Sequence, residues 1–227
     1  MYKKFLNARS PLRLLEKGLH GGLGKGNMGV VVARHGVGKS SFLVGVALDD
    51  LMRGESVLHV SLDHSVAHVR AFYDTVFEDL ASSTHLADAA RVHTDVDRNR
   101  RIRAYAPNDF EVARLREAVK LESESGARPS LIVIEGLDFD AVERDMVAEL
   151  KALAGEIEVE VWLSAISHRE APMSEGVERV EDLLSVILTL EPDGGHVRLR
   201  ALKDHENPDV SDLHVALDPK SLLLVRS

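Results

Sequence analysis

The segment "VVVARHGVGKSSF", from Val30 to Phe42, joins an apolar run to a glycine-rich turn and decides the fold. It is similar to the phosphate-binding signature G-x-x-x-x-G-K-[ST], in which backbone N–H groups and a helix N-terminus hold phosphate oxygens. Ala33 stands where the signature has its first glycine. A methyl group is compatible with the extended backbone at the end of a strand, so we expect the loop to keep its anion-binding shape.

The residues of this loop have separate expected roles. Lys39 would reach the β- and γ-phosphates, and the Ser40 hydroxyl would bind Mg²⁺. Gly36 and Gly38 supply the backbone freedom of the tight turn. The predicted nucleotide-binding residues are His35, Gly36, Val37, Gly38, Lys39, Ser40 and Ser41.

Strand and helix patterns alternate on both sides of the loop. Buried strands are predicted over 28–33, 56–62, 101–105, 130–134 and 159–165. Helices are predicted over 10–19 and 39–53, and around 69–80, 112–119 and 142–153, where apolar residues recur at helical spacing. This alternation implies an α/β fold with a mostly parallel sheet flanked by helices. Four further strands, over 184–190, 196–202, 213–217 and 221–225, imply a C-terminal antiparallel extension.

Composition restricts the class of protein. The chain has 227 residues, of which 44% are hydrophobic and 29% charged, and we expect one domain over 1–227 with 1–26 as an entry helix and turn. It has no cysteine, which excludes disulfides and thiolate chemistry. No apolar run approaches the roughly 18 residues of a membrane span, so we expect a cytoplasmic protein without membrane contact. The net charge of −9 argues against a dedicated nucleic-acid binder.

Two carboxylates follow predicted strands. Glu135 follows the strand over 130–134, and Asp63 follows the strand over 56–62. Parallel sheets bind their ligands at the carboxyl ends of the strands, so both residues should face the phosphate loop. Glu135 is the expected second support of Mg²⁺, and Asp63 is the expected carboxylate that orients an attacking water. The alternatives are a surface carboxylate for Glu135 and a helix-capping role beside Ser65 for Asp63.

The order of the motifs resembles that of RecA-like P-loop ATPases, in particular the branch of KaiC-type ATPases and DnaB-type replicative helicases. After the loop, the segments "HVSLD", "LIVIEG", "WLSAISHR" and "RLRALKDH" carry this resemblance, which covers roughly residues 14–225. It implies a RecA-like core that binds ATP and Mg²⁺, hydrolyses ATP to ADP and assembles into a homo-oligomer, with a hexamer as one expected form.

The resemblance also implies roles for two residues outside the loop. His168, after the strand over 159–165, matches the position of a γ-phosphate sensor, beside Ala165 and Ser167. Lys203 matches the first residue of a Lys-x-Arg pair that reaches the nucleotide of the neighbouring subunit. His205 stands in place of the arginine and lacks its permanent forked guanidinium. The alternatives are a polar loop residue for His168 and a solvated strand lysine for Lys203.

The two carboxylates depart from the pattern of the family. The family usually has Glu where this chain has Asp63, and Asp where it has Glu135. Both groups would still face the phosphates, so nucleotide binding should persist. A misplacement of about 1 Å can cost about 100-fold in rate, so we expect slow or absent hydrolysis.

Three functions remain open. The first is an ATPase with a regulatory or assembly role, the second a DNA-linked recombination or helicase-type ATPase, and the third a nucleotide-gated interaction module without hydrolysis. The loop from Ser167 to Asp182 has five acidic residues against Arg169 and Arg179, and this balance would repel a phosphate backbone. DNA is therefore not an expected partner, and a protein partner is not identified.

Two other groups have competing interpretations. His64 and His68 are four residues apart at the start of a predicted helix, which allows a metal pair, but no third ligand is evident. The run "RVHTDVDRNRRIR", from Arg91 to Arg103, has five Arg against two Asp. It could contact phosphates, but a solvated edge is the simpler interpretation.

Overall fold

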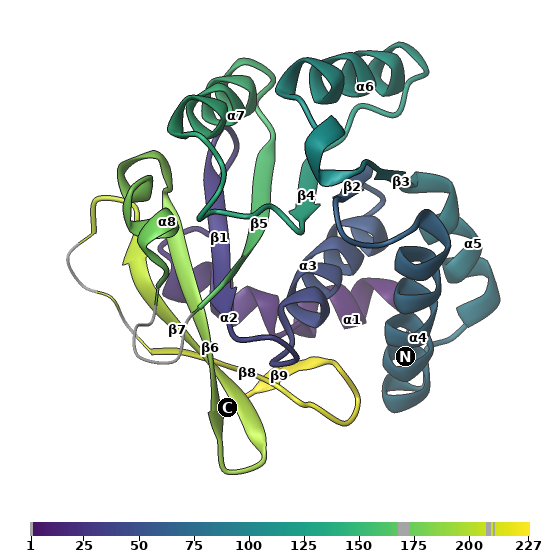
Figure 1. Cartoon of the computed structure of the whole chain (residues 1–227). Coiled ribbons are helices and arrows are strands. Elements are labelled where there is room, and N and C mark those ends of the chain that lie inside the picture. The colour runs from purple at the N-terminus through teal and green to yellow at the C-terminus, as the bar shows by residue number, and fades with distance from the viewer. Residues whose placement is uncertain (1, 168–172, 208–209, 211) are drawn as a thin grey trace.

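The computed structural model describes residues 2–167, 173–207, 210 and 212–227. These residues form one nine-stranded sheet (Figure 1). The strands are β1 (Met28–Ala33), β2 (Val57–Ser61), β3 (Arg100–Ala104), β4 (Leu131–Glu135), β5 (Glu160–Ile166), β6 (Val186–Asp193), β7 (His196–Asp204), β8 (Asp212–Leu217) and β9 (Leu224–Arg226). Their order across the sheet is β3-β2-β4-β5-β1-β6-β7-β8-β9.

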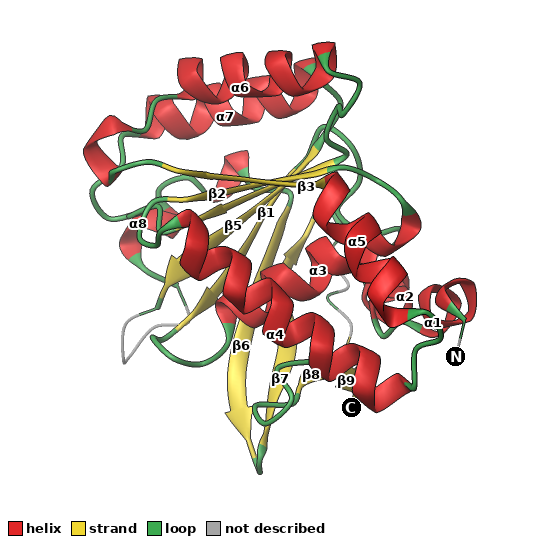
Figure 2. Cartoon of the chain, turned by 90° about the vertical axis from the view of Figure 1, so that its right-hand side faces the viewer, coloured by secondary structure: helices red, strands yellow, loops and turns green. Residues whose placement is uncertain are grey.

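The helices lie on both faces of this sheet (Figure 2). They are α1 (Lys3–Arg9), α2 (Leu12–Gly18), α3 (Lys39–Arg53), α4 (Val66–Thr84), α5 (Ala89–Asn99), α6 (Val112–Glu124), α7 (Arg144–Glu156) and the short α8 (Glu175–Glu178). Helices α1 to α5 pack on one face, with Leu43 and Tyr73 in the core there. Helices α6 and α7 cover the other face through Leu115 and Leu150. The predicted α/β fold with a helix-flanked, mostly parallel sheet is confirmed.

The direction of the strands changes only after β6. Strands β1 to β6 pair in parallel, whereas β7, β8 and β9 pair antiparallel. The first strand of the predicted C-terminal extension, β6, therefore belongs to the parallel part, because it pairs with β1 in the register Val30 to Ile187. The last strand is shorter than predicted, since Leu222 has a positive φ of 57° and residues 221–223 turn before β9.

Two helices were not predicted from the sequence. Helix α5 lies where we expected a solvated edge, because only Val92 and Val96 of its 11 residues are buried and the apolar period is short. Helix α1 has seven residues and no side-chain cap. It is held by packing on α3, where Leu6 is buried and the Asn7 side chain donates to the Met52 carbonyl oxygen at 2.9 Å.

Candidate functional site

A cleft of about 1200 Å³ opens at the carboxyl ends of the parallel strands. Strand β1 lies at the centre of this edge, between β5 and β6, and the chain leaves it for β2 on the far side of β4 and β5. Such a crossing point is where open parallel sheets bind ligands. The cleft is lined by the β1–α3 turn, by residues after β2, β4 and β5, and by Phe72 and Leu222.

The turn between β1 and α3 has the geometry of an anion-binding loop. Ala33 ends β1 and is buried, as expected for a strand residue. Gly36 and Gly38 have φ of 74° and 118°, a region that residues with a side chain rarely adopt. At Gly38 a methyl group would also be 2.2 Å from the Leu217 Cδ2, so only glycine fits. Helix α3 begins directly afterwards and directs its free N–H groups at the cleft.

Lys39 lies between this loop and two carboxylates. Its Nζ donates to the carbonyl oxygens of Ala33 and Arg34, at 3.0 and 3.1 Å. Burial lowers the pKa of Lys39, while the negative charges of Glu135 and Asp63 act in the opposite direction. The ammonium group is thus held at the mouth of the loop, in the field of both carboxylates.

The two carboxylates lie at adjacent strand ends, as predicted. Strands β2 and β4 are neighbours, and Ser61 is in register with Glu135. Glu135 is buried, whereas half of the Asp63 side chain is exposed to the cleft. The Ser61 hydroxyl donates to Asp63 Oδ1 at 3.0 Å and fixes its direction. Asp63 does not cap α4, because Ser65 has that role and accepts from the His68 N–H.

Glu135 keeps its charge although it is buried. Burial alone would raise its pKa, but hydrogen bonding and charge from His59, with the hydroxyl of Ser40, outweigh it and lower the pKa. His59 Nε2 lies 3.1 Å from Glu135 Oε2. Ser40 and Glu135 are therefore joined at the cleft, as expected of residues that share one cation.

The segment after β5 contributes serines to the cleft. Ser164 and Ser167 line it, and the Ser164 hydroxyl accepts from the Gly136 N–H at 3.4 Å. Ala165 is buried in the core instead. His168, the predicted γ-phosphate sensor, lies outside the described residues.

Lys203 and His205 lie away from the cleft of their own chain. Lys203 is paired with Ile187 on β6, and its Nζ donates to the Glu181 carbonyl oxygen at 2.7 Å. His205 is bound locally, with Nδ1 2.9 Å from Asp204 and Nε2 3.0 Å from the Leu23 carbonyl oxygen. His205 thus ties β7 to the segment before β1 and is not extended like an arginine finger.

The arginine-rich run from Arg91 to Arg103 is mostly engaged in ion pairs within the chain. Arg101 and Arg103 both contact Glu122, at 3.0 and 3.1 Å. Arg100 is buried and is paired with Asp97. This arrangement fits the structural interpretation and not a phosphate-binding surface.

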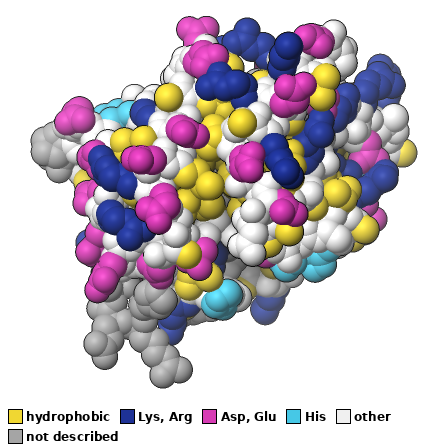
Figure 3. Space-filling view, turned by 45° about the horizontal axis from the view of Figure 1, so that its top comes forward, with side chains coloured by type: hydrophobic (Ala, Val, Ile, Leu, Met, Phe, Trp, Pro, Cys, Tyr) yellow, Lys and Arg dark blue, Asp and Glu magenta, His cyan; other side chains and the backbone are white. Residues whose placement is uncertain are grey.

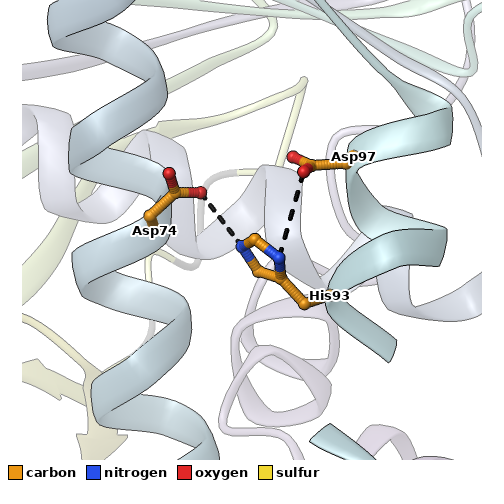
Figure 4. A group of neighbouring side chains, drawn as sticks. All are labelled: Asp74, His93 and Asp97. Atoms are coloured by element: carbon orange, nitrogen blue, oxygen red, sulfur yellow. Dashed lines mark hydrogen bonds and ion pairs between the residues drawn. The ribbon is translucent and has the colours of Figure 1, made fainter. Parts of the chain in front are cut away.

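His93 lies between the carboxylates of Asp74 and Asp97 (Figure 4). Its distances to them are 3.0 and 3.9 Å, and the group joins α4 to α5. Arg100 contacts both carboxylates as well, so a positive charge is already in place and we assign no metal there. His64 and His68 stack with ring centroids 4.3 Å apart, and the described residues bring no third ligand to them.

Sequence reasoning did not select several residues of the site. Phe72, Leu222, Asp138 and Ser164 line the cleft from a helix, a late turn, a loop and a strand. His59 is buried behind Glu135. A histidine inside the apolar strand "VLHVS" was the available signal, since an ionisable group is rarely placed there without a partner.

Comparison with known proteins identifies the fold. No protein-family model and no curated protein matches the sequence of this chain. Its structure is similar to that of the ATPase domain of a DnaB-type helicase, with a TM-score of 0.75 at 16% sequence identity, over 92% of this chain and 87% of that chain. The chain thus has the fold of a RecA-like ATPase domain. In the part of the chain that the structure describes, no helix is long and apolar enough to cross a membrane.

Proposed function

We propose that this chain binds ATP with Mg²⁺ in the cleft at the β1–α3 turn and acts as a slow RecA-like ATPase with a regulatory or assembly role. The observation that carries the proposal is the convergence of Lys39, Asp63 and Glu135 on one phosphate-binding loop. The likeness of the fold to the ATPase domain of a DnaB-type helicase supports it.

The residues fit a magnesium ion. The Ser40 hydroxyl and the Glu135 carboxylate are hard oxygen donors of the kind that Mg²⁺ prefers, and they already interact. When bound, the ion would neutralise charge on the β- and γ-phosphates. Lys39 would leave the carbonyl oxygens of Ala33 and Arg34 to contact the phosphates, and Glu135 would stay ionised to support the ion.

Asp63 is the residue that would act on the attacking water. It is exposed to the cleft, and Ser61 fixes one of its oxygens, so the other is free to accept a hydrogen bond from water. Its side chain is one methylene shorter than the Glu that is usual in the family. Turnover should therefore be slow, because the distance between the water and the phosphorus is not ideal.

A DNA-linked function has less support. Of the acidic residues between 167 and 182, Glu175, Glu178, Glu181 and Asp182 are exposed. The face shown in Figure 3 carries charges of both signs side by side and presents no continuous basic stripe. A phosphate backbone would find little attraction there.

Thermal unfolding with and without Mg²⁺–ATP tests the proposal. Ligand at about 100 times its Kd adds roughly 2.7 kcal/mol to stability, which is a Tm rise of roughly 5–10 °C for a domain of this size. Lys39→Ala should lose most of the rise. The absence of any rise for the wild type at millimolar Mg²⁺–ATP would refute the proposal, whereas binding without turnover would favour the nucleotide-gated interaction module.

A further inference from the structure

His59 is buried at a place where the proposed chemistry has not used it. It is in the middle of β2, between Ile102 of β3 and Val133 of β4, and its side chain is 0% exposed. An apolar side chain would pack there at less cost, because burying an imidazole removes it from water. Its neighbours explain the choice.

The two ring nitrogens of His59 face two different partners. Nδ1 is 3.1 Å from the Tyr73 hydroxyl, and Nε2 is 3.1 Å from Glu135 Oε2. Within the described residues, Nε2 has no partner with full hydrogen-bond geometry, so the Glu135 carboxylate is the acceptor at which it is aimed.

Tyr73 selects which nitrogen carries the hydrogen. It is completely buried, and burial raises its pKa, so the hydroxyl keeps its proton. When that hydroxyl donates to Nδ1, Nε2 of a neutral imidazole must be the N–H that faces Glu135. Tyr73 is fixed in turn by Arg100, whose guanidinium carbon lies 4.8 Å from the ring centroid.

We propose that His59 is a positioning residue for the magnesium site: it holds the Glu135 carboxylate in the orientation in which this group supports a cation bound at Ser40. This inference rests on the proposed function. Groups that orient a metal-supporting carboxylate commonly change metal affinity by about 10- to 100-fold when removed. The effect should appear in the dependence of ATP binding on Mg²⁺, and not in the contacts of the loop with phosphate.

The test compares the Kd for a fluorescent ATP analogue in EDTA and in Mg²⁺. For the wild type, Mg²⁺ should tighten binding. His59→Leu should reduce this tightening by at least about 10-fold and leave the Kd in EDTA within about threefold. His59→Gln, which can place an amide N–H near the position of Nε2, should retain most of the tightening. Tyr73→Phe, which keeps the ring and removes the hydroxyl, should give an intermediate loss.

Each outcome separates the two proposals. A wild type that does not bind the analogue would refute the proposed function itself. A wild type that binds with Mg²⁺-dependent affinity, together with a His59→Leu protein of unchanged Mg²⁺ dependence, would overturn the role of His59 alone. If His59→Leu does not fold, His59→Asn decides: its shorter amide reaches toward Tyr73 but not Glu135, so it should lose the tightening that His59→Gln retains. Equal tightening in these two variants would overturn the inference.

Discussion

The side chain of Asp63 lies directly against the backbone of Gly136. A methyl group at residue 136 would be 2.8 Å from the Asp63 Cγ, too close for any real contact. Gly136 follows Glu135, so the residue after one carboxylate sets the position of the other. The local geometry of the cleft therefore depends on the absence of a side chain at this position.

Gly136→Ala should displace Asp63 and reduce ATP turnover, while Mg²⁺–ATP binding is retained. A displacement of about 1 Å can cost about 100-fold in rate. Gly126→Ala is a matched control, because both glycines have φ of 82° but nothing lies within 4 Å of a methyl group at 126. Each variant should lose about 1–2 kcal/mol of stability from the backbone conformation. Equal turnover in the two variants would show that the contact with Asp63 is not needed.

Glu160 should make the stability of the protein depend on pH. Burial, with the charge of Asp50, raises its pKa to about 7 from the ordinary 4.5. Because the folded-state pKa is the higher one, the contribution of Glu160 is fully present below about pH 4.5 and is lost as the pH rises through about 7. Glu160→Gln should therefore flatten the decline of Tm between about pH 6 and about pH 8.5, measured by calorimetry, and should be more stable than the wild type at the alkaline end. A decline of equal slope in both proteins would contradict this assignment.

We expect no tight binding to single- or double-stranded DNA at physiological salt. The net charge is −9, and the arginines of β3 are paired with Glu122 within the chain. Fluorescence anisotropy with labelled oligonucleotides of several lengths measures this directly. Sub-micromolar binding that strengthens with length would promote the helicase-type alternative, since it would require a basic path that the described surface does not show.

The central part of the fold could be predicted because local sequence determines it. The run before Gly36 is apolar and ends in a turn that only glycine can form, and α3 stops at Gly54, which has φ of 95°. The positions of Asp63 and Glu135 followed from one rule, that parallel strands bring their carboxyl ends to the same edge.

The remaining features depend on contacts between segments that are distant in the sequence. Helix α5 buries two valines among polar residues, so its apolar pattern is too short to recognise. The link from Tyr73 through His59 to Glu135 joins a helix and two strands, and no spacing in the sequence encodes it. The same holds for His205, which is bound to Asp204 and to the carbonyl oxygen of Leu23, at the other end of the chain.

Lys203 is expected to complete a site that two subunits share. It does not line the cleft of its own chain and is bound to the carbonyl oxygen of Glu181. If it acts on the nucleotide of a neighbouring copy, turnover per chain should rise with protein concentration, because the complete site exists only in the oligomer. Asp63→Asn should abolish turnover in cis and leave ATP binding nearly intact, since it removes the charge and keeps the shape.

Mixing two inactive variants separates a role between subunits from a role within one. In a mixture of Lys203→Ala and Asp63→Asn chains, some interfaces pair an intact Asp63 with an intact Lys203, so part of the activity should return. Each variant alone, at the same total concentration, is the control. Sedimentation at the assay concentration must show that both variants still assemble, because Lys203→Ala also removes the bond to Glu181. Turnover that does not depend on concentration, from a monomer, would exclude the role of Lys203 across a subunit boundary and leave it as a residue that joins β7 to the segment before β6.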